Sequence, residues 1–320
     1  MANGKWLVTG IAGFCGSTLA ELLVAQGCQV FGVDVAAVDA DAAQRLGAAC
    51  ELIQADLVDA GAVRRLVAEV EPDYIAHLAA LTNPAAPLAT LYEANVYGTV
   101  HLLDAVKAAA PACTVLIAGS SAQYGLTSPD ENPITEAQSF RPITHYAVTK
   151  ATQDLVGAMY SASGVRVIRT RTFNIVGPRQ RANFVSSTFA KQIVEIERGL
   201  RSPLIEVGNL DARRDFVDVR DVVRAYWLAL AHGRPGAVYN VCSGKERSVR
   251  ELLDGLLALS TVADIDVRQV PHRMQAADVP AQVGSYERLA ADTGWRPEID
   301  WEQMMRDLLD YWREVVAGGG

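Results

Sequence analysis

Short apolar runs alternate with amphipathic segments through the first half of the chain. The runs at 5–10, 28–34 and 73–80 predict buried strands, and 15–27 has the apolar spacing of a helix and ends at a glycine. Buried strands that alternate with helices are typical of a parallel, doubly wound sheet. The same pattern predicts strands at 51–55, 114–121 and 165–173, and helices at 40–47, 59–70, 87–109 and 144–160.

This rhythm breaks after about residue 172. Helical spacing continues at 184–200, 216–233, 248–259, 285–292 and 301–316, with strands at 202–209 and 238–244. The pattern predicts an α/β fold in which a doubly wound (Rossmann) sheet carries a smaller, interleaved α/β lobe. We expect a first domain at 1–172, to which 216–240 return, and a second lobe at 173–215 and 241–320.

Composition narrows the possible partners. Half of the 320 residues are hydrophobic, which is enough for a sizeable core, and the net charge is −8. An acidic chain has no basic surplus for phosphate backbones, so we expect no nucleic-acid partner. No apolar run approaches the roughly 20 residues that span a bilayer, and the N-terminus lacks a signal pattern. We therefore expect a cytoplasmic protein without a membrane partner.

The five cysteines and five histidines do not suggest a metal or disulfide framework. The cysteines are scattered without a CxxC pair, which is typical of reduced thiols. The histidines lack HxxxH or HExxH spacing, so we expect no metal site.

A glycine-rich stretch, TGIAGFCG at 9–16, connects the first predicted strand to the first helix. Gly10, Gly13 and Gly16 allow a tight turn, close approach of a pyrophosphate and close packing of helix on sheet. The N–H groups of the helix N-terminus then face the phosphates. The position of this stretch at the start of an alternating domain indicates a dinucleotide site.

Two carboxylates follow at the ends of the next strands. Asp34 ends the second strand, where a carboxylate accepts both ribose hydroxyls of adenosine and repels a 2′-phosphate. No arginine follows until Arg45, so we expect NAD(H) rather than NADP(H). Asp56 is placed either to meet the adenine edge or to stabilise a turn.

Tyr146 and Lys150 lie one helical turn apart in ITHYAVTK, residues 143–150. In a helix, this spacing places both side chains on one face. An ammonium near a phenol favours the phenolate, so we expect Lys150 to lower the pKa of Tyr146 toward neutrality and make it an acid–base catalyst.

These motifs together resemble an extended short-chain dehydrogenase/reductase over essentially the whole chain. The resemblance rests on the glycine loop, HLAA at 77–80, the pair Ser120–Ser121, and Tyr146 with Lys150. The segments at 171–180, 189–197, 206–222, 236–244 and 293–299 are similar to the GDP-mannose 4,6-dehydratase branch, and within it to the GDP-4-dehydro-6-deoxy-mannose reductases.

The resemblance implies roles for individual residues. Ser120 and Tyr146 would reach the C4 oxygen of the sugar, and Lys150 would also hold the nicotinamide ribose. Ser121 is a second hydroxyl beside the substrate. Further cofactor contacts would come from Phe14, Cys15, Leu57, Leu78, Ala79 and Ala80.

One departure from the dehydratases favours a different reaction. They carry a Glu two residues after the Ser or Thr, where this chain has Ala122. Alanine cannot exchange a proton, so reduction at C4 is favoured over removal of water. Ile175 departs from the His common in this branch, and Asp34 departs from its Arg-bearing, NADP-type pattern. An NAD-retaining 4-epimerase is the alternative enzyme, ahead of a 4,6-dehydratase, and a dinucleotide sensor on the same fold is the alternative outside enzymes.

The resemblance also implies a nucleotide-sugar substrate, with a GDP-sugar favoured, and a homodimer. It places Asn174 near the diphosphate, Phe184 and Val185 near the base, and Arg214 and Arg273 on the phosphates. Arg179, Arg181 and Arg213 are expected to be surface charges. The predicted helices 87–109 and 144–160 carry apolar residues on more than one face, which indicates a partner subunit. These residues include Leu88, Leu91, Leu102, Leu155 and Met159.

Overall fold

The computed structural model describes residues 4–37, 40–83, 85–270, 279 and 281–318. Its larger sheet has seven strands in the order β10-β6-β5-β4-β1-β2-β3, and every neighbouring pair is parallel. The order reverses beside β1, which confirms the predicted doubly wound fold. The strands are β1 (Lys5–Thr9), β2 (Gln29–Asp34), β3 (Cys50–Gln54), β4 (Tyr74–His77), β5 (Thr114–Ser120), β6 (Arg166–Thr172) and β10 (Val238–Val241).

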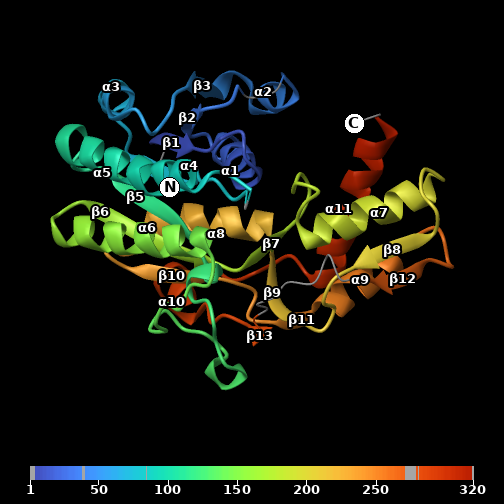
Figure 1. Cartoon of the computed structure of the whole chain (residues 1–320). Coiled ribbons are helices and arrows are strands. Elements are labelled where there is room, and N and C mark those ends of the chain that lie inside the picture. The colour runs from blue at the N-terminus through green and yellow to red at the C-terminus, as the bar shows by residue number, and fades with distance from the viewer. Residues whose placement is uncertain (1–3, 38–39, 84, 271–278, 280, 319–320) are drawn as a thin grey trace.

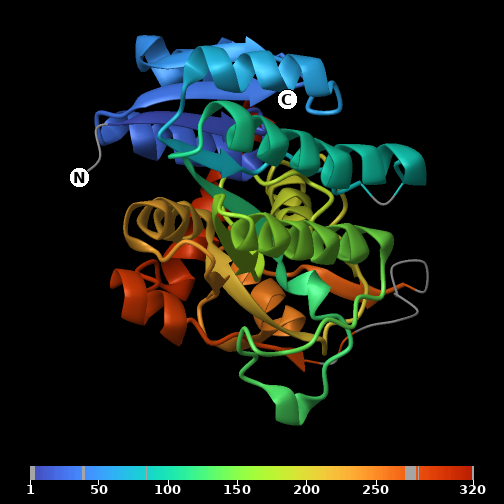
Figure 2. The ribbon, with the colours of Figure 1, turned by 90° about the vertical axis from the view of Figure 1, so that its left-hand side faces the viewer.

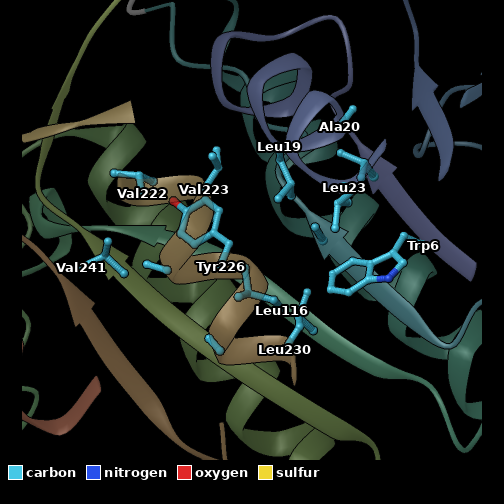
Figure 3. Close-up of a cluster of buried hydrophobic side chains, with 14 of the residues drawn as sticks. Trp6, Leu19, Ala20, Leu23, Leu116, Val222, Val223, Tyr226, Leu230 and Val241 are labelled. Carbon is cyan, nitrogen blue, oxygen red and sulfur yellow. The ribbon is translucent and has the colours of Figure 1, made fainter. Parts of the chain in front are cut away.

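Helices cover both faces of this sheet (Figure 1). Side chains alternate along a strand, so Trp6 and Val8 join the core on one face while Leu7 joins the core on the other. The first face is covered by α1 (Phe14–Ala25) and α8 (Val219–His232), whose leucines and valines pack toward Trp6 and Leu116 in Figure 3. The second face is covered by α3 (Ala60–Val70), α5 (Gly98–Ala109) and α6 (His145–Ala162).

The segment predicted as one helix at 87–109 contains a wider turn. It forms α4 (Leu88–Tyr92), a π-helical turn at Glu93–Tyr97, and α5. Asn95 in this turn is buried, and its carboxamide bonds to both the N–H and the carbonyl of Leu81, which follows β4. The turn therefore satisfies backbone groups of a neighbouring loop, a contact that local periodicity does not reveal.

A second lobe lies beside the larger sheet, on the right in Figure 1 and largely behind the sheet in Figure 2. It contains β7 (Asn174–Val176), β9 (Arg213–Asp218), β11 (Glu246–Ser248) and β13 (Ala281–Gln282) in one sheet, and the pair β8 (Leu204–Val207) and β12 (Asp266–Gln269). Its core lies among α7 (Val185–Glu197), α9 (Val249–Leu257) and α11 (Trp301–Ala317). Two further short α-helices are α2 (Ala40–Leu46) and α10 (Glu287–Thr293).

One predicted helix starts later than its apolar spacing suggests. The segment at 216–233 begins as the end of strand β9, and α8 starts at Val219 because the Asp218 carboxylate accepts the N–H of Arg220 at 2.8 Å. The prediction of helix from residue 216 is therefore wrong. The predicted domain boundary between residues 215 and 216 falls inside β9. As expected for the returning segment, β10 belongs to the larger sheet and α8 packs on it. The division into two domains stays a prediction.

Candidate active site

A cavity of about 610 Å³ opens at the carboxyl ends of β1, β4, β5 and β6. Parallel sheets bind ligands at this edge, outside the point where the strand order reverses. The larger sheet contributes the loops after these strands, and the second lobe contributes residues of β7, β9 and the start of α7. The cavity is thus lined by both lobes.

The glycine-rich loop forms one wall of this cavity. Gly10 has a φ of +75°, and a Cβ there would lie 2.8 Å from the backbone nitrogen of Ala79. A Cβ at Gly16 would collide with the carbonyl oxygen of Gly10, so α1 can approach the loop this closely only with glycine. Gly13, Phe14 and the residues that follow line the cavity at the N-terminus of α1. This cradle suits a pyrophosphate, whose charge the free N–H groups can bind.

The two candidate aspartates stabilise turns. Asp34 accepts the N–H of Ala12 at 3.0 Å and that of Ala36 at 3.2 Å, which holds its carboxylate beside the glycine loop. Asp56 accepts the N–H of Val58 at 2.9 Å. Of its two predicted roles, stabilising a turn or meeting the adenine edge, this contact supports the turn. Of the cofactor candidates, Gly10, Gly13, Phe14, Cys15, Gly16, Leu78, Ala80, Tyr146 and Lys150 line the cavity, whereas Asp34, Asp56, Leu57 and Ala79 do not.

Ser120, Tyr146 and Lys150 meet at the centre of the cavity. Ser120 ends β5, and α6 carries the other two side chains after Thr144, whose hydroxyl accepts the N–H of Ala147 at 3.1 Å. The Ser120 hydroxyl lies close enough to the Tyr146 phenol to act on its pKa. Lys150 donates from Nζ to the carbonyl of Ala118 at 2.9 Å. Residues far apart in the sequence are thereby joined by direct contacts.

Burial sets the protonation of the tyrosine and the lysine. Burial raises the pKa of Tyr146 to about 12, and the nearby Ser120 hydroxyl opposes that rise only in part. Burial lowers the pKa of Lys150 to about 8, and the Cys15 thiol opposes that shift. The expectation that Lys150 depresses the pKa of Tyr146 is therefore wrong for this fold. Desolvation dominates the pKa of the phenol, and the Lys150 ammonium donates to the Ala118 carbonyl.

The candidate substrate residues also line the cavity. Asn174, Phe184, Val185 and Arg214 line the end that the second lobe forms, whereas Ser121 lies next to Ser120 after β5. The Arg214 guanidinium donates to the carbonyl of Val279 at 2.6 Å, and this bond fixes its position in the second lobe. Arg273 lies outside the described residues.

The three arginines expected on the surface have different environments. Arg213 is exposed and pairs with Glu246. Arg179 instead connects the lobes, since its guanidinium bonds to Glu21 of α1 at 2.6 Å. Arg181 is exposed but also lines the cavity, so it is a candidate phosphate partner that the sequence did not single out.

Other cavity residues carry no local signal in the sequence. Tyr226 lies on an amphipathic helix and would be taken as a core residue; its hydroxyl bonds to that of Thr172 at 2.7 Å. Gln180 is buried and accepts the hydroxyl of Ser186 at 2.6 Å. The fold alone brings such side chains to the cavity.

Two negative findings apply to the described part of the chain. There, no three His, Cys, Asp or Glu side chains gather in a way that could hold a metal ion. Within the same residues, no helix has both the length and the apolar character that crossing a membrane requires.

Comparison with known proteins places the chain in a family. The sequence profile of the family described as GDP-mannose 4,6 dehydratase matches residues 7–308. GDP-6-deoxy-D-mannose reductase of Pseudomonas aeruginosa is 41% identical over 250 residues, which cover 77% of this chain and 82% of that protein. GDP-mannose 4,6-dehydratase of Vibrio cholerae is 29% identical, over 95% of this chain and 92% of that protein.

Solved structures agree with this placement. A structure of RMD from Pseudomonas aeruginosa complexed with NADPH matches with a TM-score of 0.84 and 33% identity, over 98% of this chain and 99% of that one. A UDP-glucose 4-epimerase from Thermus thermophilus in complex with NAD matches with a TM-score of 0.84 and 28% identity, over 97% and 99%. On the profile match and the shared fold, this chain is a member of the GDP-mannose 4,6-dehydratase family.

Proposed function

We propose that the protein reduces the C4 keto group of a nucleotide-linked 4-keto-6-deoxy sugar with a nicotinamide dinucleotide. The favoured substrate is GDP-4-dehydro-6-deoxy-mannose and the product GDP-rhamnose. One observation carries the proposal: Ser120, Tyr146 and Lys150 line the same cavity, while Ala122 beside them has no group that can exchange a proton. The 41% identity to a GDP-6-deoxy-D-mannose reductase supports the same reaction.

The glycine cradle is where a dinucleotide would bind. Gly10 and Gly16 leave room that a Cβ would fill, and the N-terminus of α1 faces that room. We favour NADH over NADPH because Asp34 keeps a carboxylate beside the loop and Arg45 bonds to Glu21. Bound there, a reduced nicotinamide supplies the hydride for C4.

The chain's own residues supply the proton and the binding of the oxygen. A phenol whose pKa is about 12 keeps its proton at neutral pH, so Tyr146 can donate it to the C4 oxygen as negative charge develops there. Ser120 donates a hydrogen bond to the same oxygen. The ammonium of Lys150, which donates to the Ala118 carbonyl, adds positive charge to the cavity and would contact the ribose of a bound cofactor.

Recognition of the nucleotide falls to the far end of the cavity. The guanidinium groups of Arg214 and Arg181 suit a diphosphate, which planar forks bind through paired hydrogen bonds. Phe184 and Val185 offer an apolar surface to the base. Asn174 donates to the carbonyl of Asp215 at 3.2 Å, which fixes its side chain. We assign Asn174 a further contact to the diphosphate.

The substrate assay separates the candidate reactions. The purified protein is incubated with NADH and GDP-4-keto-6-deoxy-mannose, and separately with an intact 6-hydroxy sugar nucleotide. A reductase consumes NADH only with the keto compound. Interconversion of the intact sugar with no net NADH change would instead establish the 4-epimerase, the second candidate, which the structural match to a UDP-glucose 4-epimerase favours. Loss of water from the intact sugar would contradict the argument from Ala122.

We also propose a homodimer built on the outer face of α4, α5 and α6. Four large apolar side chains on this stretch are more than half exposed: Leu88 (51%), Tyr97 (57%), Leu155 (62%) and Met159 (57%). Leu91 and Leu102 point inward and are buried. Light scattering at micromolar concentration should give the mass of two chains, and Leu155→Glu with Met159→Glu should give one. A single-chain mass for the unmodified protein would refute the dimer.

A further inference from the structure

A buried polar cluster lies behind Ser120, outside the cavity. Gln123, Asp154 and Arg171 are 0%, 3% and 6% exposed, and Arg169 completes the group. Asp154 pairs with Arg171 at 2.9 Å and with Arg169 at 2.9 Å. None of these four residues lines the cavity, and the mechanism above uses none of them.

The cluster fixes which way the Gln123 carboxamide points. Asp154 accepts the Gln123 amide hydrogen, from Nε2 to Oδ2, at 2.9 Å. A carboxylate paired with two guanidinium groups can only accept, so the amide nitrogen must face Asp154. The amide oxygen consequently faces the opposite way, where Oε1 accepts the N–H of Ser120 at 3.2 Å.

This bond closes a short turn around Ser120. The Ser120 hydroxyl oxygen accepts the N–H of Ala122 at 3.2 Å, so one lone pair is occupied and the hydroxyl proton is left for the cavity. The two bonds together hold both the backbone and the side chain of Ser120. Gly119 permits this arrangement, since a Cβ there would lie 2.9 Å from Gln123 Oε1.

We propose that Gln123 is a positioning residue: the Asp154 ion pairs orient its carboxamide, the carboxamide holds the Ser120 peptide, and the Ser120 hydroxyl is thereby aimed at the reacting oxygen. The inference rests on the proposed function, in which Ser120 bonds to the sugar C4 oxygen. A misplacement of about 1 Å in a catalytic group can cost on the order of 100-fold in rate, so loss of this bond should be visible in turnover.

The first test removes the bond and keeps the volume. Gln123→Met should lower kcat about 10-fold to 100-fold with KM for the sugar nucleotide unchanged. Its Ser120 amide should exchange hydrogen faster, measured by mass spectrometry on a peptide spanning β5 without any turnover. The matched control is Gln192→Met, which removes another buried carboxamide, one that donates to the Thr188 carbonyl of its own helix and does not line the cavity. It should change neither quantity.

The second test restores the bond by pH. In Gln123→Glu, a protonated carboxyl can donate to Asp154 and accept from Ser120, whereas an ionised one repels Asp154. The ratio of variant to wild-type kcat should therefore rise as pH falls from 8 to 6. Wild-type kcat in Gln123→Met, or a pH-independent ratio with unchanged amide exchange, would overturn the inference.

The two proposals fail separately. If the wild type interconverts or dehydrates the intact sugar instead of reducing the keto sugar, the reductase proposal is refuted. The same variants are then compared on the observed reaction, because Ser120 would bond to a sugar oxygen in each, and the amide exchange needs no substrate at all.

Discussion

The two ends of the cavity are built differently. At one end, Ser120 lies on β5 and Lys150 on α6, and a hydrogen bond holds each of them. The Ser120 N–H donates to Gln123, and the Lys150 ammonium donates to the Ala118 carbonyl. At the other end, Phe184 and Val185 are 42% and 40% exposed at the start of α7. The end proposed to perform chemistry is held by hydrogen bonds, and the end proposed to bind the nucleotide is partly exposed to solvent. We therefore expect the first end to tolerate fewer substitutions than the second.

Removing the proton donor should have the largest effect. Tyr146→Phe keeps the ring and loses the hydroxyl, so kcat should fall about 10²–10⁴-fold while KM for the sugar nucleotide changes little. Initial rates of NADH consumption measure both. A variant that retains most of its kcat would show that the proton comes from elsewhere, and the contrast between the two ends would collapse.

At the recognition end, the expected effect is on binding. Arg214→Ala should raise KM for the sugar nucleotide about 10-fold to 100-fold, because a hydrogen bond to a charged group contributes about 1.5–3 kcal/mol. Its kcat should stay near that of the wild type. Arg213→Ala is the matched control, since that arginine pairs with Glu246 and does not line the cavity. A loss of kcat without a change in KM would place Arg214 with the chemistry instead.

Alkaline pH should act on the catalytic end alone. Lysine is charged below its pKa, and burial lowers the pKa of Lys150 to about 8, so its charge is complete at pH 6.5 and lost as pH rises through 8. Tyr146, with a pKa of about 12, keeps its proton over this range. The rate should fall about 10-fold between pH 7 and pH 9. A flat profile to pH 10 would show that the lysine charge is not required.

The choice of dinucleotide should change least. Asp34→Ala removes the charge that opposes a 2′-phosphate, and the ratio of kcat/KM for NADH to that for NADPH should fall several-fold. Asp34→Asn also removes the charge but keeps a side-chain oxygen that can accept the Ala12 N–H, so a similar fall in this variant would assign the effect to the charge and not to a disturbed loop. Equal efficiency of the unmodified protein with both dinucleotides would contradict the preference.

The same contrast explains what the sequence could predict. The glycine loop, the end of β5 and the Tyr146–Lys150 pair are short segments whose spacing encodes their geometry, and each lines the cavity as expected. The parallel sheet follows in the same way from local apolar runs. Contributions that depend on long-range packing could not be predicted. Tyr226 looks like a core residue, and Gln180 like an ordinary polar loop residue, until the fold places both at the cavity. Burial also reverses the expected pKa shift of Tyr146.

The position of β10 bears on how the protein is made. β10 lies at the edge of the larger sheet, beside β6. Val241 pairs with Thr172 although Val241 comes 69 residues later in the chain. At about 5–20 residues per second, a ribosome needs roughly 3–14 s to make that interval. During it, β6 is an open sheet edge and the apolar surface that α8 later covers on α1 is bare. We therefore expect a nascent chain paused in this interval to aggregate more readily than one in which α8 and β10 are already made.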